Sequence, residues 1–287
     1  MSTPRTYPYT EQALVTLPRS TENSGPTSSF SLSYALTRPN SDPPQRLALV
    51  AHPWGRLGGS KDDRVVVAVT DALVKERYTV CRYDARGAGS SDTVAATWTY
   101  VCYGNWIELK PLGTSAETSI APFDSGLAEA EDFSHLVEAV LLPLIPPDHP
   151  SSTPIDLLLI GYSYGSLAAS SSPPLKMIRQ GLTLRTRTIL ISYPCSVLSF
   201  LTFFKSSHYT QSLTKSTQRD KRPTLAIWGT RDQFTCVVKY EEWFRQIQEV
   251  DSERVTEGVQ VEGADHFWRE QGDKQRLIQT IVEWVRR

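Results

Sequence analysis

The sequence predicts an α/β fold with a mostly parallel, doubly wound sheet, antiparallel strands at its N-terminal end and helices on both faces. Short apolar runs alternate with segments of helical periodicity along most of the 287 residues. The runs 46–51, 155–160 and 224–229 are nearly continuous in apolar residues, as buried parallel strands are. The first two runs are followed by glycine-containing loops and the third ends in Gly229, which is where a strand turns toward a helix.

Length and charge limit the class of protein. A chain of 287 residues suits one large α/β domain, so we expect a single domain over residues 1–287. The formal net charge of −1 gives no electrostatic reason to expect a nucleic acid or an anionic membrane as a partner. Residues 1–5 lack the apolar core of a secretory signal, and no apolar run is long enough to span a bilayer, so we expect a cytoplasmic protein.

The cysteines have no paired or metal-type spacing. They are Cys81, Cys102, Cys195 and Cys236. Such a pattern is typical of reduced thiols in a cytosolic protein, with a disulfide left open, and it indicates no metal site. The oligomeric state does not follow from the sequence.

The N-terminal part predicts strands of two kinds. Residues 13–17 form a short strand, and residues 29–36 alternate apolar and polar side chains, as a half-buried antiparallel strand does. Residues 46–51 form a central parallel strand. Apolar residues at helical spacing predict a helix over 62–77, and the next strand covers 78–83.

A glycine-rich loop, residues 52–60, follows the strand 46–51. It lacks the phosphate-binding pattern, because no hydroxyl residue follows Lys61, and it lacks a dinucleotide-binding fingerprint. The alternatives are a loop that presents backbone N–H groups and an ordinary strand-to-helix turn. Because Pro53 has no N–H group, the first donor would be Trp54 or a residue just beyond it. We expect His52 to brace this loop by hydrogen bonding.

The region between the predicted strands 78–83 and 155–160 holds less regular sequence. We expect Asp84 and Arg86 to form a buried or half-buried pair that braces their loop. Residues 92–122 have no clear periodicity, and their aromatic side chains either line a pocket or cap a core. An amphipathic helix with Ser125 as its N-cap is predicted over 125–142.

The run 155–160 ends in Gly161-Tyr162-Ser163-Tyr164-Gly165, and small residues follow. This pattern predicts a buried strand, a sharp turn and a helix start, with Ser163 in a strained conformation above the sheet edge. A serine held there suits a nucleophile, and the next backbone N–H can stabilise an oxyanion. The alternative is that glycines and serines simply make a tight turn.

The C-terminal part continues the alternation of strands and helices, with one cap-like insertion. The predicted elements are a strand at 187–193, a cap at 195–223, a strand at 224–229, a helix at 237–250, a strand at 258–262 and a helix at 274–287. The insertions at about 93–122 and 195–223 could form a lid. Six aromatic residues within them are candidate pocket residues: Trp98, Tyr103, Trp106, Phe200, Phe203 and Phe204.

Ser163, Asp232 and His266 each fall in a loop after a predicted strand, and such loops gather at one edge of a parallel sheet. A histidine, with an unperturbed pKa of about 6.5, can accept the serine proton and return it to a leaving group. A buried carboxylate fixes the imidazole tautomer. Asp265 is the competing carboxylate, but it adjoins His266 and would point away from the ring, so we favour Asp232. We expect His135, His149 and His208 to be packed or solvated rather than catalytic.

These motifs together resemble the α/β-hydrolase superfamily over nearly the whole chain. They are the His-Pro loop at 52–60, Arg-Gly-Ala-Gly-Ser-Ser at 86–91, Gly-Tyr-Ser-Tyr-Gly-Ser at 161–166, Gly-Thr-Arg-Asp at 229–232 and Gly-Ala-Asp-His-Phe-Trp at 263–268. The His-Pro loop is similar to that of a branch with short caps. The resemblance implies the α/β-hydrolase fold, with Ser163 as nucleophile, Asp232 as acid and His266 as base. It implies oxyanion N–H groups from Trp54 and Tyr164.

The sequence thus predicts a serine hydrolase that cleaves a small-molecule carboxylic ester or thioester through an acyl-enzyme, with no metal or organic cofactor. One alternative is an acyltransferase or a cyclising or rearranging enzyme of small-molecule biosynthesis that uses the same site. Another is a non-catalytic ligand-binding protein with this fold, because a fold by itself implies no activity.

Overall fold

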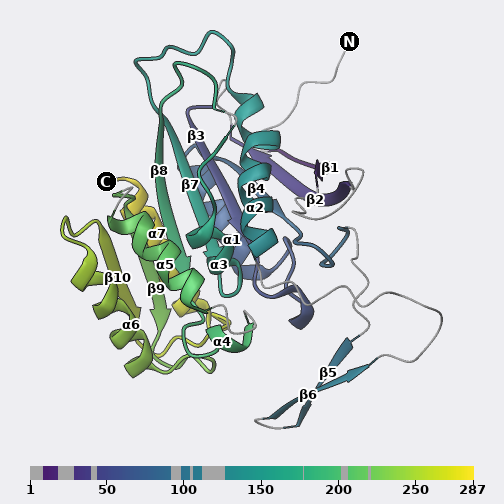
Figure 1. The fold of residues 1–287 in the computed structure, drawn as a ribbon, viewed down its shortest axis with the longest axis vertical. Coiled ribbons are helices and arrows are strands. Elements are labelled where there is room, and N and C mark those ends of the chain that lie inside the picture. The colour runs from purple at the N-terminus through teal and green to yellow at the C-terminus, as the bar shows by residue number, and fades with distance from the viewer. Residues whose placement is uncertain are drawn as a thin grey trace.

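The computed structural model describes residues 9–18, 29–39, 44–91, 98–103, 106–111, 127–176, 178–201, 206–218 and 221–287. Within them, eight strands form one sheet in the order β1-β2-β4-β3-β7-β8-β9-β10 (Figure 1). The strands are β1 (Tyr9–Pro18), β2 (Ser29–Arg38), β3 (Arg46–Ala51), β4 (Thr79–Tyr83), β7 (Ile155–Tyr162), β8 (Leu184–Ile191), β9 (Thr224–Gly229) and β10 (Thr256–Val261).

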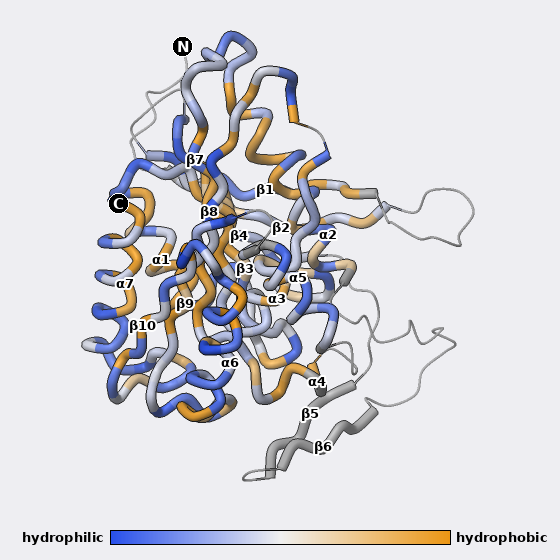
Figure 2. The backbone as a smooth tube through the Cα atoms, turned by 60° about the vertical axis from the view of Figure 1, so that its left-hand side comes forward, coloured by the Kyte–Doolittle hydropathy of each residue, from blue (hydrophilic) through white to orange (hydrophobic). Residues whose placement is uncertain are grey.

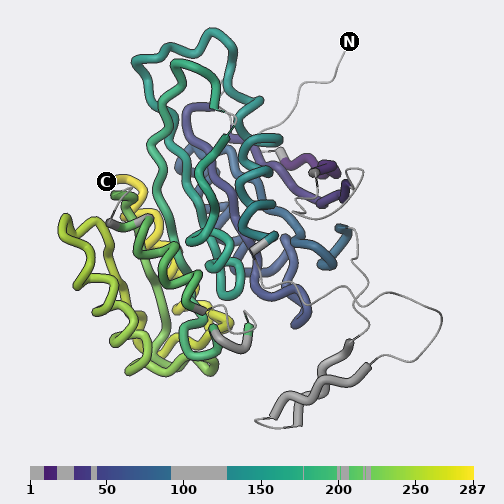
Figure 3. The backbone as a smooth tube through the Cα atoms, in the orientation of Figure 1, coloured from purple at the N-terminus to yellow at the C-terminus, as the bar shows by residue number. Residues whose placement is uncertain are grey.

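The sheet is parallel from β4 to β10, whereas β2 pairs antiparallel with both β4 and β1. In Figure 3 the N-terminal strands and the C-terminal part of the chain lie at opposite edges of this sheet. The predicted fold class, with antiparallel N-terminal strands on a parallel sheet, is therefore confirmed.

Helices cover both faces of the sheet. They are α1 (Arg64–Lys75), α2 (Leu127–Leu136), α3 (Gly165–Ser171), α4 (Leu198–Leu201), α5 (Ser206–Gln218), α6 (Val237–Val250) and α7 (Gln271–Val285), with short 3-10 turns η1 (Gly55–Leu57) and η3 (Leu142–Leu144) and a π-helical turn η2 (Val137–Leu141). No helix in the described part of the chain combines the length and apolar character that crossing a membrane requires.

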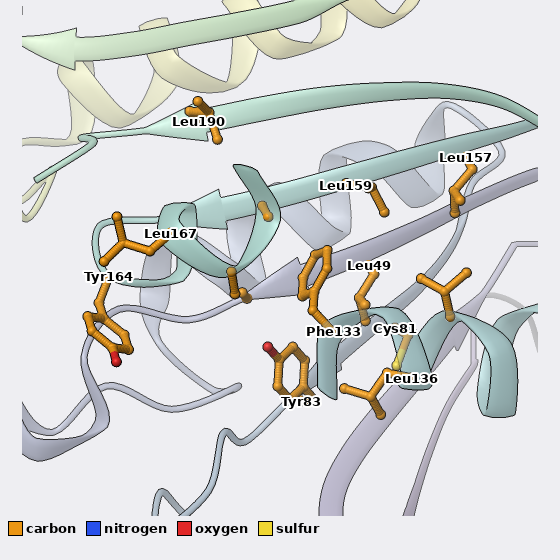
Figure 4. Close-up of a cluster of buried hydrophobic side chains, with 14 of the residues drawn as sticks. Leu49, Cys81, Tyr83, Phe133, Leu136, Leu157, Leu159, Tyr164, Leu167 and Leu190 are labelled. Atoms are coloured by element: carbon orange, nitrogen blue, oxygen red, sulfur yellow. The ribbon is translucent and has the colours of Figure 1, made fainter. Parts of the chain in front are cut away.

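The strands supply two cores, one on each face, because successive side chains point to opposite sides of a sheet. Leu159 of β7 packs in the core beneath α2, α3, α5 and α6, where Figure 4 shows it near Phe133. The next residue, Ile160, packs in the other core with α1 and α7. Figure 2 shows hydrophobic and hydrophilic residues alternating along α7, as in a helix with one face on a core.

The order of the strands reverses between β3 and β7. From β3 the chain passes through α1 to β4 on one side, whereas β7 lies on the other side of β3. In parallel sheets the loops after two such strands diverge and leave a crevice at their carboxyl ends. Ala51 and Gly161, at the ends of β3 and β7, are paired in register, so the two loops that follow begin side by side.

The structure adds local detail to two segments between β4 and β7. Residues 98–111 contain a hairpin of β5 (Trp98–Tyr103) and β6 (Trp106–Pro111), in which alternating aromatic and β-branched residues favour extended backbone. The predicted helix 125–142 is confirmed over its described residues, which begin at 127: it is α-helical over α2, widens into the π-helical turn η2 and passes into the 3-10 turn η3 that contains Pro143. Ser125, its expected cap, lies outside the described residues.

The pocket and lid roles of the two insertions, 93–122 and 195–223, stay predictions. The side chains of Trp98, Tyr103, Trp106 and Phe200 lie outside the description, as do residues 202–205 entirely, which include Phe203 and Phe204. Their pocket-lining role, the lid and the single-domain assignment are therefore still expectations.

Candidate active site

Ser163 lies in the sharp turn between β7 and α3, with a φ of 53°. A non-glycine residue in this left-handed region costs about 1–3 kcal/mol, so the surrounding contacts must hold it there. Two backbone hydrogen bonds do so. The Ser163 N–H donates to the Ile191 carbonyl on β8 at 2.8 Å, and the Ser166 N–H donates to the Ser163 carbonyl at 2.9 Å.

The glycines on either side of this turn are required by close approach of the backbone. A Cβ atom at Gly161 would lie 2.3 Å from the Gly165 carbonyl oxygen. A Cβ atom at Gly165 would lie 2.6 Å from the carbonyl oxygens of both Ala51 and His52. The start of α3 therefore packs directly on the end of β3, which brings the Ser163 turn and the His52 loop into contact.

Three side chains that are remote in sequence are joined by hydrogen bonds at this edge of the sheet. His266 Nε2 lies 2.8 Å from Ser163 Oγ, and His266 Nδ1 lies 2.7 Å from Asp232 Oδ2. The exposed fractions of Ser163, Asp232 and His266 are 9%, 8% and 3%. Because an ionised carboxylate only accepts, the imidazole proton belongs on Nδ1, which leaves Nε2 to accept from the serine hydroxyl. The arrangement can thus remove a proton from Ser163.

Asp232 is held by three further donors. Its Oδ1 accepts from the N–H groups of Phe234 at 2.8 Å and Thr235 at 3.0 Å. Its Oδ2 accepts from the hydroxyl of Tyr240 at 2.9 Å. Burial and the nearby Asp232 charge raise the pKa of Tyr240 well above its usual value, so the phenol keeps its proton and donates it to the carboxylate.

His266 is positioned by its own backbone. Its N–H donates to the side-chain oxygen of Gln233 at 3.1 Å, and its carbonyl accepts from the hydroxyl of Tyr162 at 2.8 Å. Sequence reasoning missed Gln233, Tyr162 and Tyr240. Tyr162 precedes Ser163 and Gln233 follows Asp232, so their positions beside candidate residues were a signal in the sequence. Tyr240 lies inside a helix, where no sequence signal pointed to it.

The competing carboxylate, Asp265, points elsewhere. Its Oδ1 accepts from the Arg269 N–H at 3.0 Å, and its Oδ2 forms an ion pair with the Arg269 guanidinium. The Asp265 carboxylate thus bonds to Arg269, just before α7, and not to the imidazole of His266.

The two residues expected to supply oxyanion donors lie beside each other. Tyr164 is the N-cap of α3, and Trp54 is the N-cap of η1. Their rings stack with centroids 6.0 Å apart. The backbone N–H groups at the start of a helix carry partial positive charge, which suits a developing anion.

His52 ties this loop down with both ring nitrogens. Its Nε2 accepts from the Ala85 N–H at 2.9 Å, so the ring proton lies on Nδ1, which donates to the Pro53 carbonyl. Burial lowers the pKa of His52, and the imidazole therefore stays neutral. In a trans peptide the C=O and N–H groups point in opposite directions, so fixing the Pro53 carbonyl also fixes the direction of the Trp54 N–H.

The expected pair between Asp84 and Arg86 does not form. Asp84 is fully buried and bonds to Lys61 instead, with Nζ at 2.6 Å from Oδ2 and the Lys61 N–H at 2.8 Å from Oδ1. Arg86 binds both carboxylate oxygens of Asp132 on α2, at 2.6 and 2.7 Å. Each residue still braces the loop after β4, but through separate contacts, one to Lys61 in the turn before α1 and one to Asp132 on α2.

The remaining histidines take no part in this arrangement. His135 is half-buried in α2, His149 bonds to the Thr153 carbonyl at 2.8 Å, and His208 is exposed on α5. Among the described residues, no three His, Cys, Asp or Glu side chains converge in a way that would hold a metal ion.

A cavity of about 280 Å³ lies elsewhere, between the sheet, α2 and the segment after α3. Phe133, Leu157, Leu159 and Leu184 are among the residues that line it, and none of Ser163, Asp232 and His266 does. The candidate active site is therefore identified by its hydrogen bonds and not by enclosed volume.

No known family model and no curated protein sequence matches the chain. Solved structures do. An α/β serine hydrolase homologue from Coxiella burnetii shares 20% identity and a TM-score of 0.58, over 88% of this chain and 91% of that one. An α/β serine hydrolase without lid from Xanthomonas campestris shares 21% identity and a TM-score of 0.56, over 95% and 94%.

An esterase from Pyrococcus furiosus is similar as well, with 16% identity and a TM-score of 0.59, over 96% of this chain and 92% of that one. Identities this low carry the fold and not the substrate. The similarity nonetheless extends over nearly the full length of both chains. The chain therefore has the α/β-hydrolase fold that the sequence motifs indicated.

Proposed function

We propose that the protein is a serine hydrolase that cleaves a carboxylic ester or thioester of a small molecule through an acyl-enzyme. The observation that supports this most directly is the unbroken hydrogen-bond chain from Ser163 Oγ through the His266 imidazole to the buried Asp232 carboxylate. A serine hydroxyl is a poor nucleophile at neutral pH, and this chain is the arrangement that activates it.

In the acylation step, Ser163 Oγ attacks the substrate carbonyl carbon while His266 Nε2 takes the hydroxyl proton. The carbonyl oxygen becomes an oxyanion, which accepts hydrogen bonds from the backbone N–H groups of Tyr164 and Trp54. Collapse of this intermediate breaks the bond to the leaving group, which departs as an alcohol or thiol with the proton from His266.

In the deacylation step, water replaces the alcohol or thiol. His266 takes a proton from the water, the hydroxide attacks the acyl carbon, and Ser163 leaves with that proton as the free acid is released. Asp232 remains ionised in both steps and stabilises the imidazolium, so no metal or organic cofactor enters the reaction.

A fluorophosphonate probe tests the nucleophile. We expect labelling of the native protein and no labelling of Ser163→Ala. Ser172→Ala is the matched control, because this serine lies just after α3 and its hydroxyl donates to the Ala169 carbonyl at 3.4 Å, away from His266. An unlabelled native protein, or equal labelling of Ser163→Ala, contradicts the proposal.

Turnover separates hydrolysis from its alternatives. We expect release of free acid from p-nitrophenyl esters or acyl-CoA thioesters graded by chain length, at a rate that Ser163→Ala abolishes. Product that forms only when an acceptor alcohol or thiol is added would make the protein an acyltransferase. Labelling without any turnover would leave a ligand-binding protein.

A further inference from the structure

Two phenylalanine rings pack on His266 and leave an aromatic surface open to solvent. The Phe234 ring meets the imidazole edge-on at a centroid distance of 4.5 Å, and the Phe267 ring meets it at 5.5 Å. The two phenylalanine rings lie 5.7 Å apart. His266 is 3% exposed, whereas Phe267 is 44% exposed, so the outer ring of this group faces water.

These two rings come from the loops that carry the candidate acid and base. Phe234 follows Asp232 after β9, and Phe267 follows His266 after β10. Their loops are tied together, because the Gln233 side chain accepts the His266 N–H. The aromatic surface and the imidazole are therefore held together by contacts within and between these two loops.

The chemistry divides the space around Ser163 into two sides. The oxyanion must lie toward the N–H groups of Tyr164 and Trp54. The leaving group must lie toward His266, because Nε2 delivers a proton to its oxygen or sulfur atom at hydrogen-bond distance. Phe234 and Phe267 pack on His266, and so they adjoin the leaving-group side.

The exposed ring is held in place by charge. The Arg269 guanidinium lies over Phe267, with its central carbon 5.6 Å from the ring centroid, and Asp265 fixes that guanidinium by an ion pair and a backbone hydrogen bond. A cation on an aromatic ring and a clamped loop preorganise Phe267. A rigid aromatic surface of this kind binds a flat aromatic group better than a flexible chain.

Resting on the proposed function, we propose that Phe234 and Phe267 form a leaving-group subsite that selects esters of aromatic alcohols. The substrate class is thus an aryl ester, whose ring stacks against or meets the edge of Phe267 while its oxygen accepts the proton from His266. The acyl group extends on the other side, past Trp54 and Tyr164.

Two acetate esters test this inference, phenyl acetate and hexafluoroisopropyl acetate. Both alcohols are of similar acidity, and both esters form the same acyl-enzyme, so the ratio of their kcat/KM values reports only leaving-group binding in acylation. We expect Phe267→Ala to lower the phenyl-to-fluoroalkyl ratio about fivefold to tenfold, which is the worth of one aromatic contact of about 1 kcal/mol or slightly more.

Two further variants separate the effect of the aromatic ring from that of apolar bulk and from that of removing an exposed apolar side chain. Phe267→Leu keeps apolar bulk without a ring and is expected to lower the ratio in the same direction. Val238→Ala is the matched control, because Val238 on α6 is 69% exposed and comparably apolar, and we expect it to leave the ratio unchanged. The rate of fluorophosphonate labelling verifies that each variant is folded.

The outcomes are distinguishable. If the native protein cleaves both esters but both phenylalanine variants keep its ratio, or lose both activities in equal proportion, the subsite is overturned and the hydrolase proposal stands. If the native protein cleaves neither ester and takes no fluorophosphonate label, the hydrolase proposal fails and the subsite fails with it.

Discussion

The hydroxyl of Tyr240 lies 2.9 Å from Oδ2 of Asp232, the same oxygen that accepts from Nδ1 of His266 at 2.7 Å. One carboxylate oxygen thus serves two donors. The phenol stabilises the ionised carboxylate and restrains its rotation, while it withdraws part of the charge that the imidazolium would otherwise feel. In the proposed mechanism Tyr240 is therefore a positioning residue, which acts on Ser163 through Asp232 and His266.

We expect Tyr240→Phe to move the acid limb of the kcat/KM profile toward higher pH. A carboxylate with one donor fewer attracts a positive imidazolium more strongly, which disfavours the neutral imidazole that the proposed mechanism needs as its base. The pH-rate profile between about pH 5 and 9 measures this shift.

The control for this variant is Tyr78→Phe. Tyr78 is also buried, and its hydroxyl accepts from Arg187 at 3.0 Å, away from the triad. Both variants lose a buried hydroxyl, but only Tyr240→Phe should move the acid limb. An unchanged acid limb in Tyr240→Phe would show that the hydroxyl has only a structural role.

We expect His52→Asn to lower kcat while KM changes little. The imidazole fixes the Pro53 carbonyl and hence the Trp54 N–H, which in the proposed mechanism bonds to the oxyanion and not to the ground-state substrate. Loss of one oxyanion donor costs about 10²–10³ in kcat, and misdirection of the donor should cost part of that.

His149→Asn is the companion variant, because His149 also bonds to a backbone carbonyl but in the turn before β7. Steady-state kinetics with one ester should show wild-type kcat for His149→Asn. A rise in KM at constant kcat in His52→Asn would assign that residue to substrate binding and not to the oxyanion loop.

We expect Gly165→Ala to lower both stability and activity. Its Cβ would lie 2.6 Å from two carbonyl oxygens at the end of β3, so the turn would have to separate from the strand. Overpacking of this kind typically costs about 1–3 kcal/mol. Gly272→Ala in α7 is the opposite case, because nothing lies within 4 Å of its Cβ.

Thermal unfolding compares these glycine variants. Gly165→Ala should lower the melting temperature, whereas Gly272→Ala should keep or raise it, since alanine favours a helix over glycine by about 1 kcal/mol. Normal stability and normal turnover in Gly165→Ala would mean that α3 does not pack on β3 as closely as described.

We expect Lys61→Met to destabilise the protein by about 3–5 kcal/mol at neutral pH, because it leaves the Asp84 carboxylate buried without its cation. Burial pushes the pKa of Asp84 up, but the hydrogen bonds and charge of Lys61, with the Ser90 N–H, outweigh it and hold the pKa below its usual value. In the native protein, the contribution of Asp84 to the free energy of unfolding is therefore complete above the unfolded pKa of about 3.9. It is lost as the pH falls through the lower pKa of the folded state.

In Lys61→Met the sign reverses. The N–H groups of residue 61 and Ser90 still lower the Asp84 pKa, but we expect burial, the largest influence, to outweigh them once the ammonium is gone and to raise the pKa above the unfolded value. The destabilisation is then largest at neutral pH and shrinks as the carboxyl becomes protonated on acidification. Urea unfolding at about pH 5 and 7 measures this, and Lys61→Met/Asp84→Asn should recover stability at pH 7. A pH-independent loss in the single variant would rule out the charge as its cause.

Local sequence patterns were enough to predict most of the strands and helices and the three candidate catalytic side chains. Apolar continuity marked β3, β7 and β9, and the helical period marked α6 over the residues it occupies. Ser163, Asp232 and His266 could be found because each follows a buried strand, and the carboxyl ends of parallel strands meet at one edge.

The sequence by itself thus determined the fold class and the edge of the sheet at which three reactive side chains gather, because periodicity and strand ends are local properties. Tertiary structure alone decided which side chains touch. It paired Asp84 with Lys61 instead of Arg86, and it brought Tyr240 from inside α6 onto Asp232. Those contacts depend on how the helices and loops pack on the sheet. The distance between two side chains remote in sequence is not encoded in any local pattern.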